Sequence, residues 1–133
     1  MPDISPRDAV RRLWPELDWI TDQKLREQTT NAWVRAFELS PLEPDDLNRI
    51  PFTLLIPNCP VTFMEHKRCV VHIARKAAES MHEFMGKSLP IHMDTVIAGA
   101  IWPMSASYWN MKTWMAKPDK VSAVNFCGTP SPG

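Results

Sequence analysis

Proline is the residue type that most constrains how this chain can fold, because 13 of its 133 residues are prolines. Proline has no backbone N–H and clashes with the preceding turn, so it ends or kinks a helix, although it fits the first helical position. The prolines therefore divide the chain into short segments with apolar residues at helical spacing. We predict an all-α fold of about five short helices.

The expected helices lie between these prolines. Ser5-Pro6 begins a short helix to about Trp14, and Thr21 caps a second one, residues 22–39. Residues 45–47 form one helical turn, and Asp94 or Thr95 caps a last helix through Ile101. Residues 50–57 are apolar but flanked by prolines, which favours a short extended piece or a buried loop over a central strand.

The strongest helix prediction covers residues 62–85. Thr62 and Glu65 have the spacing of a capping box, and Gly86 stands where a left-handed residue would end the helix. One apolar stripe consists of Phe63, Val70, Ile73, Ala74, Ala77, Met81 and Phe84, and His66 falls on it. The opposite, polar face consists of Glu65, Arg68, His72, Arg75, Lys76, Glu79 and Glu83.

Composition excludes several classes of protein. The 15 basic residues balance the 15 acidic ones, whereas nucleic-acid binders carry a basic excess, so a nucleic-acid partner is not expected. The three cysteines include no Cys-x-x-Cys pair, which is typical of free thiols in a reducing compartment. The first residues lack the apolar region of a signal peptide, and no apolar run is long enough to span a membrane. We expect a cytoplasmic protein with no membrane partner.

Two segments together resemble a known family. His66, Val70 and Ala74 have the spacing of an early helix in HD-domain metal-dependent phosphohydrolases, and residues 93–101 are similar to the helix that leads to their His-Asp dyad. The resemblance covers about residues 45–101. It implies a partial HD-type helical domain and a divalent metal ion (Mn, Fe, Mg, Co or Zn), with His66 as the first metal ligand. It also implies that the substrate is a phosphorylated small molecule or a nucleotide.

The chain departs from this family where the dyad should follow Ile101. The sequence there reads Trp102-Pro103-Met104-Ser105, and no histidine occurs after His92. The metal site therefore cannot be completed within one chain in the family's manner, and no catalytic residue is assigned. We expect an N-terminal helical segment (1–44), a partial HD-like domain (45–101) and a tail outside the family pattern (102–133).

The genetic code suggests an origin for this tail. Tryptophan and methionine have one codon each, so they fix part of the underlying DNA. Read one base earlier, the codons after Ile101 permit Leu-Ala-Asp-Val-Gly-Lys-Leu-Leu-Glu, which is similar to the family's Leu-His-Asp-Val-Gly-Lys-Leu-Leu-Glu. Our hypothesis is that the tail is translated out of frame from an HD-domain gene. It accounts for Trp102, Trp109 and Trp114 without a binding function.

Other interpretations come from the residues themselves. The absent dyad and the small residues of 96–101 also fit a non-catalytic helical protein-interaction module, with a homo-oligomer or a second chain as partner. His66 can instead be a core histidine bonded to a backbone carbonyl, and Cys69 is best interpreted as a small core thiol. The basic residues Lys67, Arg68, Arg75 and Lys76 are interspersed with glutamates, which favours a solvated helix face over a phosphate site.

Overall fold

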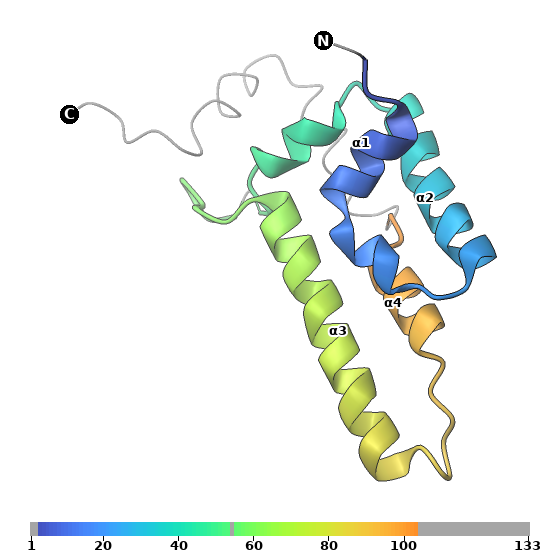
Figure 1. The fold of residues 1–133 in the computed structure, drawn as a ribbon. Helices are drawn as coiled ribbons and strands as arrows, with labels where there is room; N and C mark the ends of the chain where they lie inside the picture. The colour runs from blue at the N-terminus through green and yellow to red at the C-terminus, as the bar shows by residue number, and fades with distance from the viewer. Residues whose placement is uncertain (1–2, 54, 104–133) are drawn as a thin grey trace.

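The fold is all-α, as the proline spacing predicts. A computed structural model describes residues 3–53 and 55–103. Within them it has four α-helices, α1 (Pro6–Leu13), α2 (Gln23–Glu38), α3 (Phe63–Met85) and α4 (Met93–Ile101). Two 3₁₀-helices, η1 (Pro15–Trp19) and η2 (Pro44–Asn48), complete the element order (Figure 1). None of the helices in the described ranges is long and apolar enough to cross a membrane.

Prolines begin three of these elements. Pro6, Pro15 and Pro44 stand in the first turn of α1, η1 and η2, where a missing N–H costs nothing. The Ser5 hydroxyl accepts the Asp8 backbone N–H at 3.2 Å and caps α1. The predicted turn at residues 45–47 is η2, and Pro15 restarts the chain as η1.

Several helix ends differ from the prediction, although the start of α3 agrees with it. Thr62 and Glu65 form the predicted capping box at the start of α3. Asp22 rather than Thr21 caps α2, through a 3.1 Å bond from the Leu25 N–H. Gly86 is not left-handed, since its φ of −60° and ψ of −23° continue the helical conformation.

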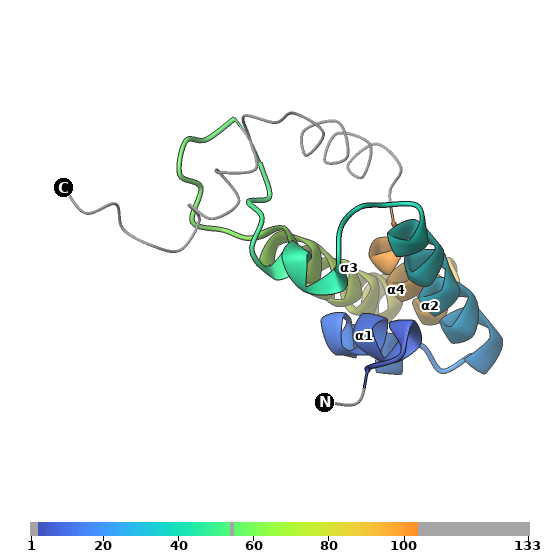
Figure 2. The same cartoon turned by 90° about the horizontal axis from the view of Figure 1, so that it is seen from above.

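The helices share one core. Trp14 and Trp33 pack with ring centroids 5.6 Å apart, and the Trp33 indole N–H donates to the Ile101 carbonyl at 2.8 Å. The buried cluster includes residues from α1, η1, α2, η2, α3 and α4. Viewed from above, α4 lies between α2 and α3 (Figure 2). The proposed boundary at residue 44 stays a prediction.

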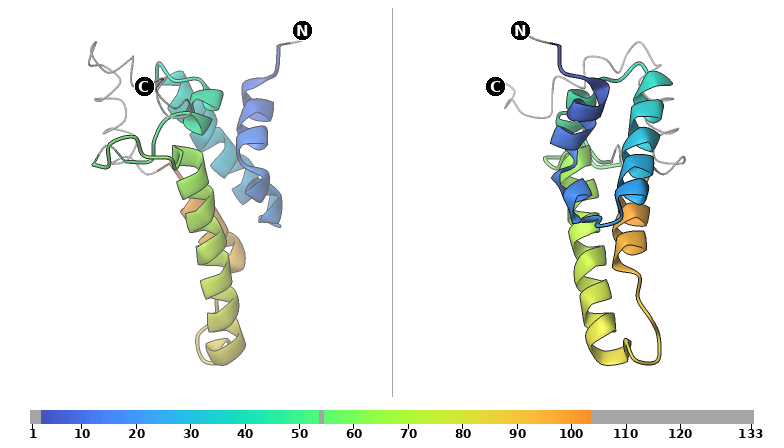
Figure 3. Two further views of the ribbon diagram at one scale, coloured as in Figure 1. Left: turned by 90° about the vertical axis from the view of Figure 1, so that its left-hand side faces the viewer. Right: turned by 45° about the vertical axis from the view of Figure 1, so that its right-hand side comes forward.

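Helices α3 and α4 form an antiparallel pair. The chain leaves α3 at Met85, turns through residues 86–92 and returns along α3 as α4 (Figure 1). The end of α4 therefore lies alongside the first half of α3. The second half of α3 extends past α1 and α2 (Figure 3).

The buried face of α3 is not the stripe that the sequence suggests. Its buried residues are Phe63, Met64, Lys67, Val71 and Ala78. Of the predicted stripe, Ile73 is 62% exposed and Phe84 is 82% exposed. The helix thus has two apolar sides, and only one of them packs against the described remainder of the chain.

The extended piece expected over residues 50–57 is limited to its start, because residues 55–58 form bends and a turn. Pro51 and Thr62 form an isolated antiparallel bridge, with a 3.1 Å bond from the Phe52 N–H to the Val61 carbonyl. A buried loop was the alternative, but Leu55 and Ile56 are exposed at its tip. The bridge brings Phe52 to the start of α3.

Candidate functional site

His66, the predicted first metal ligand, lies in the first turns of α3. The capping box at Thr62 fixes where this helix begins and hence where the imidazole emerges. The ring is exposed and stacks on Phe52, with centroids 4.6 Å apart and planes 20° apart. Its nitrogens form no hydrogen bond with a described residue. The alternative of a core histidine bonded to a backbone carbonyl is therefore wrong.

No metal centre is assembled around His66 in the described part of the chain. Residues 3–53 and 55–103 contain no group of three His, Cys, Asp or Glu side chains placed to share an ion. The end of α4 lies beside the first half of α3, but it continues as Trp102 and Pro103, which supply no metal ligand. The described residues do not fit the divalent ion that the resemblance implies.

The other histidines do not join His66. His72 bonds to Glu16 from the middle of α3, whereas His82 is near the end of that helix and His92 precedes α4. Cys69 is exposed, so its interpretation as a core thiol is wrong. Trp109 and Trp114 lie outside the described residues.

A buried carboxylate, which sequence reasoning missed, links η1 to α3. Glu16 is 1% exposed, and its Oε1 accepts the Arg68 Nε–H at 2.7 Å and lies 2.9 Å from His72 Nε2. Its Oε2 is buried without a hydrogen-bond partner in the structure. Burial by itself raises the pKa of the Glu16 carboxyl, but the bonds from His72 and Arg68 outweigh it, so the pKa lies below its ordinary value.

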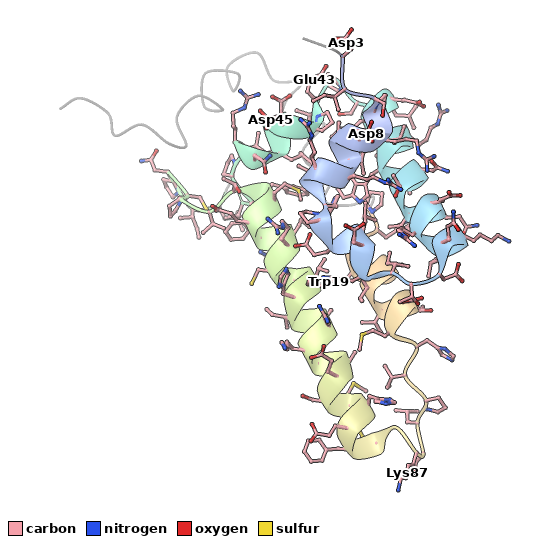
Figure 4. The ribbon with its side chains drawn as sticks, viewed as in Figure 1. Asp3, Asp8, Trp19, Glu43, Asp45 and Lys87 are labelled. Carbon is pink, nitrogen blue, oxygen red and sulfur yellow. The ribbon has the colours of Figure 1, made fainter. Side chains whose placement is uncertain are left out.

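Aromatic contacts extend this cluster along α3. Trp19, at the end of η1, packs edge-on against His72 with centroids 4.7 Å apart. The Arg75 guanidinium lies 4.3 Å from the Trp19 ring centroid, within cation–π range. Figure 4 shows Trp19 at the end of η1 that faces α3. Arg68 and Arg75 therefore hold η1 against α3 rather than forming the simple solvated face expected.

Lys67 is the other departure from that expectation. It is only 7% exposed, on the inner side of α3, and burial lowers the pKa of its ammonium group. The predicted basic cluster is thus split between the two sides of the helix. This distribution does not form a phosphate site.

Asp94 bonds to the residues that lead into α2. The expected cap of α4 at Asp94 or Thr95 is wrong, because α4 begins after His92, which makes no side-chain cap. The Asp94 carboxylate instead accepts the Thr21 N–H at 3.0 Å, the Thr21 hydroxyl at 2.7 Å and the Asp22 N–H at 2.8 Å. These bonds hold the pKa of the Asp94 carboxyl below its ordinary value, and the bond from the Thr21 backbone N–H has the largest effect.

The second apolar side of α3 contacts no other described helix. We call it the outer face, and it consists of His66, Val70, Ile73, Ala77, Ser80, Met81 and Phe84. All seven residues are exposed. The spacing was visible in the sequence, but only the packing shows that this side is free of the other described helices.

Comparisons with known proteins return no relative of this chain. No protein-family model matches it, and neither the curated proteins nor the solved structures include a match.

Proposed function

We propose that residues 45–101 are the front part of an HD-type helical domain, and that the chain as given does not hydrolyse phosphoesters. The observation that carries this proposal is that the face of α3 that begins with His66 is apolar yet exposed. Helix faces of that kind are normally covered by another element of the same domain. An exposed one fits a domain whose later helices are missing.

The position of α4 supports the same proposal. In the resembled family, the first histidine and the His-Asp dyad converge from separate helices. Here α4 runs antiparallel to α3 and ends alongside its first half (Figure 3). That end is also where the sequence leaves the family pattern. A divalent ion would supply an activated water and polarise a phosphoryl oxygen, but one histidine cannot hold it.

The test restores the missing part. We would replace the residues after Ile101 with the shifted reading Leu-Ala-Asp-Val-Gly-Lys-Leu-Leu-Glu and its continuation, change its alanine to the histidine of the family's dyad, and measure bound metal by elemental analysis. The restored chain should retain a divalent ion and the original chain should not. His66→Ala should abolish retention in the restored chain, whereas the control His82→Ala should not.

Two results contradict this proposal. One is stoichiometric metal with hydrolysis of p-nitrophenyl phosphate by the original chain. The other is a folded restored chain, verified by circular dichroism, that binds no Mn²⁺, Fe²⁺ or Zn²⁺.

A second candidate function is a non-catalytic protein-interaction module. The observation that favours it is the spacing of the outer face, in which residues 66, 70, 73, 77, 80 and 84 are separated alternately by four and three. This 3.5-residue period is typical of a helix that packs lengthwise against another helix. On this proposal the outer face binds a helix from a second chain.

Accessibility of the outer face tests the module. In the variant Ala77→Cys, a thiol reagent should label position 77 as fast as an unfolded peptide at low protein concentration, as read from peptide masses. Cys69, which is also exposed on α3, serves as an internal reference. Protection of position 77 in a monomer would mean that the chain covers its own outer face, which contradicts the module.

A further inference from the structure

The outer face of α3 has exposed charged side chains along one margin only. Lys76 and Glu83 lie along this margin, seven residues and therefore about two helical turns apart. Lys76 is 81% exposed and its Nζ lies 3.4 Å from Glu79 Oε2 within the same helix. Glu83 is exposed and forms no ion pair with a described residue. The opposite margin, with Lys67 and Ala74, turns toward the rest of the fold.

This arrangement distinguishes between the two ways in which a second helix could lie on the face. In a parallel pair of identical helices, opposite margins meet. Lys76 and Glu83 would then face the partner's margin of Lys67 and Ala74, which is turned toward the rest of the fold. In an antiparallel pair, the same margin of both helices meets around a two-fold axis. Only the antiparallel pair therefore brings the Lys76 and Glu83 margins together.

We propose that two copies of this chain pair through the outer faces of α3 in antiparallel orientation. This inference rests on the second function proposed above and names the partner as a second copy. The two-fold axis passes between Ala77 and Ser80, whose small side chains allow the two helices to approach closely. Residues equally far from the axis then face one another, so Ile73 packs on the partner's Phe84.

The charges complement one another in this pair. Lys76 lies near the partner's Glu83, and symmetry repeats the contact, so two ion pairs flank the apolar contacts. The projecting second half of α3 makes this approach sterically open (Figure 3). Ile73 and Phe84, the two most exposed apolar side chains of α3, become buried in the same step. The contact is short, so we expect a weak dimer whose population depends on protein concentration.

A charge swap in the full chain tests the pairing. Sedimentation equilibrium should show a monomer–dimer equilibrium for the original chain. Lys76→Glu and Glu83→Lys should each raise the dimer dissociation constant about tenfold, because each places like charges together. The double variant should restore dimerisation to near the original level. Lys24→Glu, the same charge change on exposed α2, is the matched control and should have no effect.

Several results would overturn the antiparallel dimer. They are a chain that stays monomeric at the highest soluble concentration, single variants that dimerise normally, and a double variant that fails to recover. Labelling of Ala77→Cys separates this failure from that of the module. If the chain never dimerises and position 77 is reactive, only self-pairing is overturned, because the outer face is still open to another protein. If position 77 is protected in the monomer, both proposals are overturned.

Discussion

Glu16 and Asp94 show how single carboxylates connect segments that are far apart in the sequence. Glu16 on η1 bonds to Arg68 and His72 on α3. Asp94 on α4 bonds to the backbone that leads into α2. Each side chain satisfies donors that its own element does not contain, so local sequence gives no signal for it. At this scale the chain depends on a few long-range polar contacts.

Removing the Asp94 carboxylate should destabilise the fold. Asp94→Ala removes three accepted hydrogen bonds at the start of α2, and we expect the free energy of unfolding to fall by about 1–2 kcal/mol. Urea denaturation followed by circular dichroism measures this change. Thr95→Ala, an exposed neighbour in the same turn, is the control and should stay within about 0.5 kcal/mol. Equal effects of the two substitutions would contradict the assigned role of Asp94.

Helix α3 is the element that determines the shape of the molecule. It is the longest of the described helices, and it packs against α4 and η2 on one side, whereas no other described helix covers the outer face. Its start is fixed by the capping box, which also places His66 beside Phe52.

The Thr62 hydroxyl should be the part of the cap that matters. Thr62→Ala leaves the Glu65 N–H without its acceptor and should lower the free energy of unfolding by about 1 kcal/mol. Thr62→Ser keeps the hydroxyl and should retain most of that stability. Thermal unfolding of both variants in parallel provides the measurement. An alanine variant as stable as the serine variant would show that the cap contributes nothing.

One core, to which all the described helices contribute, stabilises the molecule. The carboxylates of Glu16 and Asp94 add hydrogen bonds between elements that are far apart in the sequence. Both carboxyl groups have pKa values below their ordinary values of 4.5 for Glu16 and 3.8 for Asp94. The folded chain therefore binds fewer protons than the unfolded chain in acid. The stabilisation is complete above these ordinary values and is lost as the pH falls through the lowered ones.

The predicted consequence is acid instability below about pH 4.5. Urea denaturation at a series of pH values should show the free energy of unfolding falling across this range. Glu16→Gln and Asp94→Asn should each flatten that dependence, since the titrating group is gone. A flat profile in the original chain would contradict the assignment.

The helices could be predicted from the sequence because the features that mark their ends are local. Prolines, the Thr62 capping box and apolar spacing are each confined to a few residues, and α1, α2 and α3 agree with them within about two residues. The face of α3 that becomes buried could not be predicted in this way. Val71 and Val70 are adjacent and similar in chemistry, and only the approach of α4 buries one and exposes the other.

The residue types and their spacing were sufficient to predict an all-α fold, and they agree with the finding that no helix in the described ranges could cross a membrane. These properties follow from residue types and their spacing, which do not depend on distant contacts. Only the packing shows that Glu16 is buried against Arg68, that Asp94 bonds to the backbone before α2, and that the His66 side of α3 is not covered by another described helix. The physical reason is that burial and long-range hydrogen bonds depend on which elements meet.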